Sequence, residues 1–318
     1  MGQGVAGKRL FFIINRQAGS GRVASWWREF EPQLQQAGWD YFYEYTVQGE
    51  VARQVRRAVV ERGAQAVVAV GGDGSLYEAL GGLIENDALI EPQPVFVAYP
   101  AGSACDFVRS LGYTDGGCEL LRLLEHGQTR HIDVGRCAYH GADGAQRTGY
   151  FINGFDAGAG ADTCALVNAD QGELKKRHKS GKLAFKRAAM QVLMRFSYTR
   201  TEVEADGQRF SGEYIIIGAG NGRYIGGSML MFPQAALDDG KLDLLLVGRR
   251  SFISVLSVFS RVYSGGHLQI KNVDYLHARE IAINSARPLA IELDGEVPGT
   301  TPVRLTVLPQ LLPVLFPA

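Results

Sequence analysis

The chain has 318 residues, of which 46% are hydrophobic and 21% are charged, a composition typical of globular proteins and long enough for two domains. The 33 Lys and Arg residues balance the 33 Asp and Glu residues, so the formal net charge is zero. A neutral chain lacks the broad cationic face that general nucleic-acid binding requires, and we expect no nucleic-acid partner.

Strands and helices alternate over the first part of the chain. Four apolar runs of strand length are predicted as strands, at 9–15, 39–46, 66–72 and 94–100. Segments with helical apolar spacing follow them, at 23–38, at 49–63, from residue 75 onward, at 103–112 and at 118–127. This alternation predicts βαβ units and a parallel sheet with helices, whose ligands bind at the carboxyl ends of the strands. We therefore predict an α/β domain at residues 1–130.

Strand patterns joined by Gly and Asp turns dominate the rest of the chain. Eight strands are predicted, at 131–139, 147–155, 201–210, 212–221, 241–248, 279–285, 289–295 and 302–309. One basic helical insert, at about 172–197, interrupts them. The pattern predicts a mostly antiparallel β-sandwich domain at residues 131–318, and it leaves open that the final residues return to the first domain.

Glycines and an aspartate stand where the strand at 66–72 ends and the next helix begins. Glycines at such a turn let backbone N–H groups approach a phosphate, and the following helix adds its positive N-terminal end. Asp73 would repel a phosphate unless a cation lay between them, so it indicates Mg²⁺. The alternative is a turn followed by a capping box, with Ser75 as the N-cap and Glu78 three residues on. That alternative gives no reason for the run from Gly71 to Gly74.

Two further glycine loops follow strands of the same predicted sheet. One runs from Gly19 to Gly21 after the first strand, and the other spans residues 100–107 after the fourth. One glycine loop is a common turn, but three at one edge of a sheet strengthen the hypothesis of a phosphate site. Asp73, Asp106 and Asp133 would then converge on metal-bound water, although helix capping and turn chemistry explain the last two equally well.

Together these segments resemble the bacterial diacylglycerol kinase-like lipid kinases, whose N-terminal fold is shared with the NAD kinases and the 6-phosphofructokinases. The stretch GGDGSLYEALGGL at 71–83 is similar to the family's GGDGT-x-x-E segment. The stretch PAGSACDFVRSLG at 100–112 is similar to its P-x-GT-x-ND-FAR-x-LG segment. Further matches are IDVGR at 132–136, YFINGFDAGAG at 150–160, the long segment from GAGNGRYIGG to DDGKLDLLLV at 218–247, and IELDGE at 291–296.

The resemblance implies an ATP- and Mg²⁺-dependent kinase that phosphorylates a hydroxyl of a diacylglycerol-like or related lipid. It implies that Glu296 is the general base, because a lipid alcohol has a high pKa and must lose its proton as attack begins. It also implies that Asp73, Asp106 and Asp133 group near the catalytic metal. The residues that would hold ATP are Asn15, Gly19, Ser20, Gly21, Thr46, Gly71, Gly72, Asp73, Gly74, Ser75, Glu78, Gly102 and Ser103.

A second, structural Mg²⁺ site is implied by the resemblance in the second domain, at Asp239 and the backbone carbonyls of Ala236 and Lys241. A carboxylate and two carbonyls suit a hard cation. From the residues alone, this segment also reads as a polar turn. The DGE stretch that ends at Glu296 likewise reads as a hairpin turn with an exposed glutamate.

Three positions depart from the family pattern. Arg16 stands where the family usually has proline, and it either adds a phosphate contact or loosens the loop. Tyr77 and Cys105 replace asparagines, and Cys105 is either an inert buried thiol or a reactive one at the cleft. These changes leave the preference for ATP or GTP open.

The stretch from Lys175 to Arg200 has nine Lys and Arg residues and no acid, and it carries an apolar stripe at Phe185, Ala189, Val192, Leu193 and Phe196. A basic amphipathic helix of this kind either lies on anionic lipid or packs its stripe on the protein's own core. For residues 175–179 a lipid-facing or domain-junction role is favoured. We expect a membrane lipid substrate at a bilayer surface, and both a monomer and a homodimer remain open.

Four cysteines without a Cys-x-x-Cys pair fit a reducing compartment, and no apolar run approaches the roughly 18 residues of a membrane span. We therefore expect a cytoplasmic protein that associates peripherally with the inner face of the membrane. Two other functions remain as alternatives: a kinase of a soluble substrate similar to the NAD kinases, and a non-catalytic lipid- or nucleotide-binding protein. The long match at 218–247 opposes the first alternative, whereas Asp73, Asp239 and Glu296 oppose the second.

Overall fold

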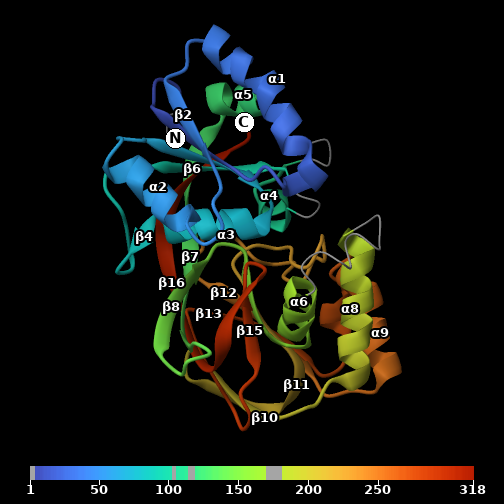
Figure 1. Cartoon of the computed structure of the whole chain (residues 1–318). Coiled ribbons are helices and arrows are strands. Elements are labelled where there is room, and N and C mark those ends of the chain that lie inside the picture. Colours follow the sequence, from blue (N-terminus) through green and yellow to red (C-terminus); the bar gives the residue numbers. More distant parts are fainter. Residues whose placement is uncertain (1–3, 102–104, 114–118, 170–180) are drawn as a thin grey trace. The chain divides into compact units, whose positions relative to one another are not determined.

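The computed structural model describes residues 4–101, 105–113, 119–169 and 181–318. The chain forms two compact units (Figure 1). The first unit consists of Met1–Ile132 and Gln310–Ala318, and the second of Asp133–Pro309. The C-terminal segment therefore belongs to the first unit.

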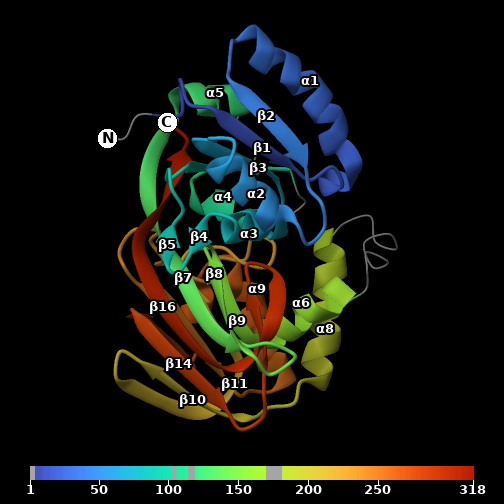
Figure 2. The same ribbon diagram turned by 60° about the vertical axis from the view of Figure 1, so that its left-hand side comes forward.

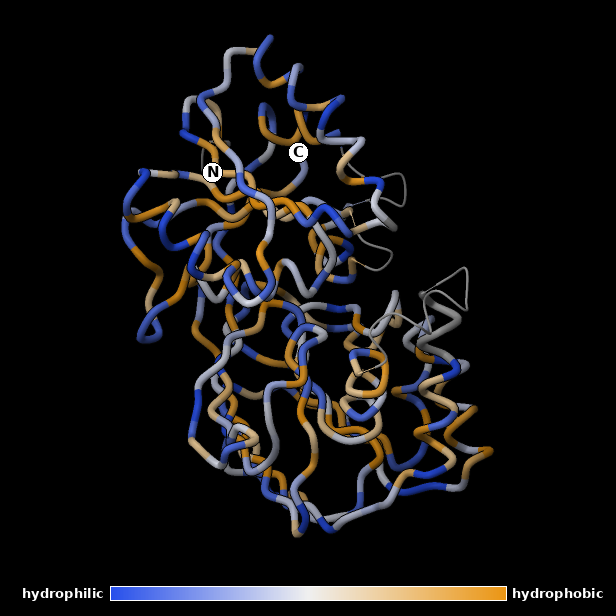
Figure 3. Tube along the Cα trace, viewed as in Figure 1, coloured by the Kyte–Doolittle hydropathy of each residue, from blue (hydrophilic) through white to orange (hydrophobic). Residues whose placement is uncertain are grey.

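The strands of the first unit run side by side in the order β2, β1, β3, β6 and the end of β16. Their bounds are Leu10–Ile14 for β1, Tyr41–Tyr45 for β2, Ala66–Gly71 for β3, Val95–Pro100 for β6 and Glu296–Phe316 for β16. Each of these pairings is parallel. β1 and β3 are buried along their whole length, which is why they read as continuous apolar runs (Figure 3). A small hairpin of β4 (Ile84–Glu85) and β5 (Ala88–Leu89) lies outside this sheet.

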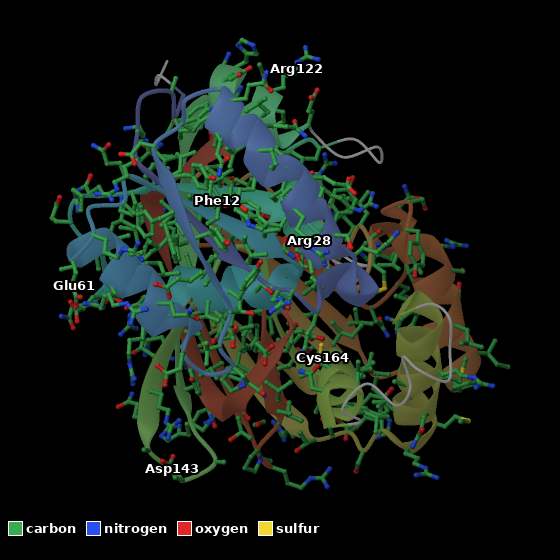
Figure 4. All side chains as sticks on the ribbon, turned by 45° about the horizontal axis from the view of Figure 1, so that its top comes forward. Phe12, Arg28, Glu61, Arg122, Asp143 and Cys164 are labelled. Carbon is green, nitrogen blue, oxygen red and sulfur yellow. The ribbon has the colours of Figure 1, made fainter. Side chains whose placement is uncertain are left out.

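Helices cover both faces of this parallel sheet, with α1 and α5 on one face and α2 and α3 on the other (Figures 1 and 2). Their bounds are Ala18–Gly21 for the 3₁₀ turn η1, Arg22–Gln36 for α1, Val51–Val60 for α2, Asp73–Gly81 for α3, Asp106–Ser110 for α4 and Leu120–His126 for α5. α1 packs Trp27 against Phe12 of β1, with ring centroids 5.0 Å apart (Figure 4 labels Phe12). Buried aromatic and aliphatic side chains therefore fix this helix on the sheet.

The second unit is built from antiparallel pairs. Its strands are β7 (Gln128–His140, which begins in the first unit), β8 (Gln146–Phe151), β9 (Gly154–Gly158), β10 (Arg200–Ala205), β11 (Gln208–Gly220), β12 (Leu242–Gly248), β13 (Val273–Ala278), β14 (Glu280–Ser285), β15 (Ala290–Leu293) and most of β16. β11 pairs with β10 through its first half and with both β12 and β9 through its second half. A β-bulge between Tyr214 and Ile216 lies where β11 changes its pairing partners. Over the described chain as a whole, most strand pairs are antiparallel.

The prediction of a single helical insert in the second half is wrong. Besides α8 (Gly181–Arg195), the unit contains α6 (Ala159–Ala169), α9 (Phe252–Val262) and the 3₁₀ turn η2 (Gly266–Gln269). α9 is short and rich in β-branched and aromatic residues, and its polar side is made mainly of serines, so its helical pattern is weak in the sequence. The sequence nonetheless has an N-cap residue at the start of α9. The hydroxyl of Ser251 accepts a hydrogen bond from the N–H of Ser254 at 3.4 Å.

The apolar stripe of α8 lies against the unit's own core. Val192, Leu193 and Phe196 pack on a buried cluster that includes Phe232 and Val255. The alternative in which the stripe packs internally is therefore correct for these residues. The basic residues 175–179 and the side chain of residue 185 lie outside what the structure describes.

Candidate functional site

The loops that follow β1, β3 and β6 are tied together at the carboxyl edge of the parallel sheet. The N–H of Asn15 donates to the carbonyl of Val70 at 2.9 Å, and the N–H of Ala101 donates to that of Gly71 at 2.8 Å. These bonds extend the strand ladder by one residue into each loop. The predicted phosphate loops at 15–21 and 71–75 therefore lie side by side, which is the arrangement that a parallel sheet offers a ligand.

A side-chain hydrogen bond joins two of these loops directly. The Nδ2 group of Asn15 donates to Oγ of Ser75 at 3.0 Å, while its Oδ1 accepts from the N–H of Gln17 at the same distance. Gly71 makes this contact possible, because a Cβ at that position would lie 2.4 Å from Oγ of Ser75. The structure thus brings together Asn15, Gly71 and Ser75, three of the residues predicted to hold the nucleotide.

The capping-box alternative for Ser75 is wrong. α3 begins at Asp73, its N-cap is Gly72, and no side chain caps it. Ser75 lies inside the first turn, where its N–H bonds to the carbonyl of Gly72 at 2.9 Å. Glu78 sits half-buried one turn further, and burial raises the pKa of its carboxyl.

Asp73 caps the neighbouring short helix. Its carboxylate accepts from the N–H of Asp106 at 3.1 Å and from the N–H of Phe107 at 3.3 Å. The N-cap residue of α4 is Cys105, which makes no side-chain cap of its own and is buried. Its thiol instead donates to the carbonyl of Gly71 at 3.6 Å, as expected for the inert alternative. Asp73 therefore supplies the acceptor that asparagine would offer at the N-cap.

The loop after β1 carries two glycines with positive φ. Gly19 has φ +60°, and a Cβ there would lie 2.7 Å from the carbonyl oxygen of Ala101, while Gly21 has φ +85°. The guanidinium of Arg16 lies over the ring of Tyr45 at 4.6 Å. Arg16 thus has a stacking partner at the edge of the sheet. Ser20 lies in η1, whereas Gly102 and Ser103 lie outside the described residues.

Gln54 of α2 holds the loop that contains Thr46, and the sequence reasoning missed it. The N–H of Thr46 donates to the carbonyl of Ile14 at 3.0 Å. Gln54 is buried, accepts from the N–H of Val47 at 3.0 Å and donates to the carbonyl of Tyr45 at 2.9 Å. The available signal was a glutamine on the apolar face of a helix, because a buried amide needs specific partners.

In the second unit, Asp133 is fully buried and bound to the turn at 237–240. Its N–H donates to the carbonyl of Leu237 at 2.6 Å, and its carboxylate accepts from the N–H of Gly240 at 2.6 Å. The amide of Asn221 donates to the carbonyl of Asp133 at 2.9 Å and to that of Ile152 at 2.8 Å. Asp133 therefore supports the segment predicted to bind a structural metal, and its convergence with Asp73 and Asp106 stays a prediction.

That segment contains Ala236, Asp239 and Lys241. Asp239 is exposed, and its carboxylate accepts from the N–H of Lys241 at 3.0 Å. In the described part of the chain no three His, Cys, Asp or Glu side chains are grouped to hold one metal ion. The predicted site relies on one carboxylate and two carbonyls, so it remains a prediction.

Glu296 follows a tight hairpin turn between β15 and β16. Leu293 pairs with Glu296, and the two residues between them both have positive φ, +47° for Asp294 and +96° for Gly295. These are the angles of a type I′ turn, which asparagine–glycine and aspartate–glycine pairs favour. Glu296 itself is exposed at the start of β16. Locally, therefore, the segment has the hairpin geometry that the residues alone predict.

The buried carboxylate of Asp294 anchors this turn. It accepts from the backbone N–H groups of Ile152 at 2.8 Å, Asn153 at 3.0 Å and Gly154 at 2.8 Å. Burial raises the pKa of Asp294 to about 6, although the three donors lower it. Asp294 thus positions the turn that carries Glu296. The Asp-Gly-Glu motif includes this residue, but the sequence predicted a function only for Glu296.

Further acidic groups lie near this hairpin. Asp156 of β9 pairs in register with Glu292 of β15, and both are buried. Within the part of the chain that the structure describes, Oδ1 of Asp156 has no hydrogen-bond partner. The thiol of Cys164 on α6 (labelled in Figure 4) has a raised pKa, through burial first and then through Glu292, Asp156 and Glu296. The sequence signal for this cluster was Asp156, which stands in an otherwise small and apolar run at 154–161.

The second unit also contains an open groove of about 690 Å³. Its apolar wall comes from α6, α8 and the start of β15, through Ala165, Leu166, Val192, Phe196, Leu289 and Ala290. Arg287 is fixed at the rim, because its guanidinium donates to Oγ of Ser197 at 3.0 Å and to the carbonyl of Tyr198 at 2.8 Å. The groove therefore combines an apolar wall with cationic and polar groups, which suits an amphipathic ligand.

The chain is a two-unit α/β and β protein. Its first unit is a parallel sheet with glycine loops at the carboxyl edge, and its second unit is built from antiparallel strands. Comparison with known proteins gives the family. The diacylglycerol kinase catalytic domain matches residues 9–137, and the YegS C-terminal NAD kinase beta sandwich-like domain matches residues 156–316. The chain therefore belongs to the family of diacylglycerol kinases and YegS-like lipid kinases, and the resemblance seen in the sequence is confirmed.

Relatives match the chain along most of its length. A diacylglycerol kinase of Bacillus subtilis is 26% identical over 98% of this chain and 97% of its own. A probable YegS-like lipid kinase of Xanthomonas euvesicatoria is 29% identical over 85% of this chain and 84% of its own. The solved structure of a putative diacylglycerol kinase from Bacillus anthracis shares the fold, with a TM-score of 0.75, 22% identity and 97% coverage of both chains. Among the described helices, none has the length and apolarity to cross a membrane.

Proposed function

We propose that this protein is an ATP- and Mg²⁺-dependent kinase that transfers a phosphoryl group to a hydroxyl of a diacylglycerol-like lipid. Membership of the lipid kinase family supports the reaction class. The observation that carries the nucleotide part is the Asn15–Ser75 hydrogen bond, which holds two glycine loops together at the edge where parallel sheets bind ligands.

The residues present fit a bound phosphate. The protein's own atoms would meet a Cβ at Gly19 or Gly71, so both loops require glycine at the sheet edge and carry no side chain there. α3 begins at the loop that contains Gly71, with Gly72 as its N-cap, so the positive end of its helix dipole lies there. Backbone donors at the start of a helix stabilise the charge on a phosphoryl group without a cationic side chain.

Asp73 also fits a role beside a cation. Each of its carboxylate oxygens accepts an N–H from α4, and a carboxylate oxygen that accepts a hydrogen bond can also be a ligand of Mg²⁺. Bound Mg²⁺ would neutralise charge on the transferring phosphoryl group. Glu296 would take the proton of the lipid hydroxyl, and Asp294 would hold the turn that positions it. The groove along α6 and α8 offers an apolar wall for the lipid.

The test is phosphoryl transfer from labelled ATP to a panel of lipids in mixed micelles, with NAD as a soluble acceptor in a parallel reaction. We expect labelled lipid with Mg²⁺, no labelled NAD, and loss of product in Asp73→Asn. Asp40→Asn is the matched control, because Asp40 is an exposed aspartate of the same unit. Labelled NAD would make a soluble-substrate kinase the better description, and nucleotide binding without any product would favour a binding protein.

A further inference from the structure

Helix α9 has a broad apolar side, of which only part is buried, while Ser254, Ser257, Ser260 and Arg261 lie on its polar side. Val255, Val258 and Val262 face the core of the second unit. Large apolar side chains beside this buried strip are exposed: Phe252 at 40%, Ile253 at 80%, Leu256 at 37% and, just after the helix, Tyr263 at 47%. Large apolar side chains that stay in water on one helix often mark a surface that binds an apolar partner. The apolar side of α9 is therefore wider than the part of it that the protein's own core covers.

Helix α8 extends the same apolar surface. It exposes Met190 at 38% and Met194 at 65%, while its inner residues pack on the cluster that contains Val255 of α9. The segment after α8 also contacts the approach to α9, because the hydroxyl of Tyr198 donates to the carbonyl of Arg250 at 3.3 Å. Both helices therefore pack on one core cluster, and both carry hydrophobic residues (Figure 3). We call the six exposed residues, Met190, Met194, Phe252, Ile253, Leu256 and Tyr263, the α8–α9 surface.

Cations dominate the sequence segments that carry this surface, and acids are scarce in them. The sequence has no Asp or Glu from 187 to 201 or from 249 to 273. The cations in these two stretches are Arg187, Arg195, Arg200, Arg249, Arg250, Arg261 and Lys271. Glu213 of β11 faces them and pairs with Arg249 at 2.6 Å. An apolar surface carried by cation-rich segments is complementary to a bilayer that contains anionic lipid, because the side chains enter the acyl region while the arginines stay at the headgroups.

We propose that the α8–α9 surface docks the protein on an anionic lipid bilayer. This proposal rests on the proposed function, since it places a lipid kinase at the surface that holds its substrate. The groove of the same unit is lined by the other side of α8, through Val192 and Phe196. Docking through α8 and α9 would therefore bring the bilayer to the helices that form the groove.

The experiment is sedimentation with vesicles of phosphatidylcholine alone and with added phosphatidylglycerol, without ATP. The variant Ile253→Glu places a charge on the most exposed residue of the surface. We expect it to lower the affinity for the anionic vesicles about tenfold or more, because an inserted side chain would have to bury a carboxylate. Val60→Glu is the matched control, since Val60 is 58% exposed on α2 of the first unit, and we expect it to bind as the parent protein does.

Two results would overturn the proposal. One is binding of Ile253→Glu to anionic vesicles with unchanged affinity. The other is a parent protein that is a dimer by light scattering and becomes a monomer in Ile253→Glu, since the surface would then be an interface between copies. Thermal unfolding followed by circular dichroism checks that the variants are folded.

Failure of the docking proposal is separable from failure of the proposed function. With a short-chain, water-soluble diacylglycerol as acceptor, Ile253→Glu should phosphorylate at the parent rate, because docking is then unnecessary. The opposite result is also informative. If vesicle binding depends on Ile253 but the protein phosphorylates no lipid, the proposed kinase function is contradicted and the docking proposal is still supported.

Discussion

Gly71→Ala should disrupt the contact between the two glycine loops. The new Cβ would lie 2.4 Å from Oγ of Ser75 and 3.5 Å from Cβ of Asn15, so Ser75 must move and its hydrogen bond with Asn15 must break. Overpacking of this kind costs about 1–3 kcal/mol, and a lost hydrogen bond costs about 1 kcal/mol. We expect the free energy of unfolding of the first unit to fall by about 2–3 kcal/mol. The affinity for ATP should fall as well, because the loops lose their register.

The assay is urea unfolding followed by tryptophan fluorescence. All three tryptophans, Trp26, Trp27 and Trp39, belong to the first unit, so the signal reports that unit. Gly81→Ala is the matched control, since a Cβ there would meet only Cβ of Ala52, at an ordinary 3.8 Å. That change should be neutral or stabilise by up to about 1 kcal/mol. Equal stability of Gly71→Ala and the parent protein would refute the packing argument.

Other contacts lead to further predictions. Asp73→Ala should speed amide hydrogen exchange at Asp106 and Phe107 and destabilise the first unit by about 1–2 kcal/mol, and unchanged exchange would rule out the capping role. Gln54→Ala should cost about 1–3 kcal/mol, because the N–H of Val47 and the carbonyl of Tyr45 lose their partners; urea unfolding measures this. Asp294 holds its proton in the folded state up to a pH of about 6, whereas the unfolded carboxyl loses it near 3.8. Stability of the second unit should therefore fall by up to about 3 kcal/mol as the pH rises from about 4 to about 6, and Asp294→Asn should remove this slope.

The strands of the first unit were predictable because their signal is local. Runs such as LFFII at Leu10–Ile14 and AVVAVG at Ala66–Gly71 are buried on both faces and read as continuous apolar segments. Helix α9 was not predicted, because its many β-branched and aromatic residues favour a strand, even though Ser254, Ser257 and Ser260 recur at helical spacing. α6 was missed because its small residues follow β9 without a break.

For the site, the glycine pattern indicated which loops lie at the sheet edge, but not how their side chains bond. The contact between Asn15 and Ser75 joins residues far apart in the sequence, and periodicity carries no information on such a pair. The carboxylate of Asp73 was assigned to a metal on charge grounds, whereas the structure shows it accepting from two N–H groups of α4. Asp294 was overlooked since a turn residue rarely has a buried side chain, and only the fold shows its three donors.

The central claim is that a carboxylate in the second unit activates a lipid hydroxyl for attack on ATP. The most direct measurement is the rate of lipid phosphorylation by Glu296→Gln at saturating Mg²⁺ and ATP, with the ATP dissociation constant measured alongside. We predict a fall in kcat of about 100-fold or more with an unchanged dissociation constant, the range that loss of a general base produces. Glu202→Gln, an exposed glutamate on β10, should keep the parent rate. A parent-like kcat in Glu296→Gln would contradict the account.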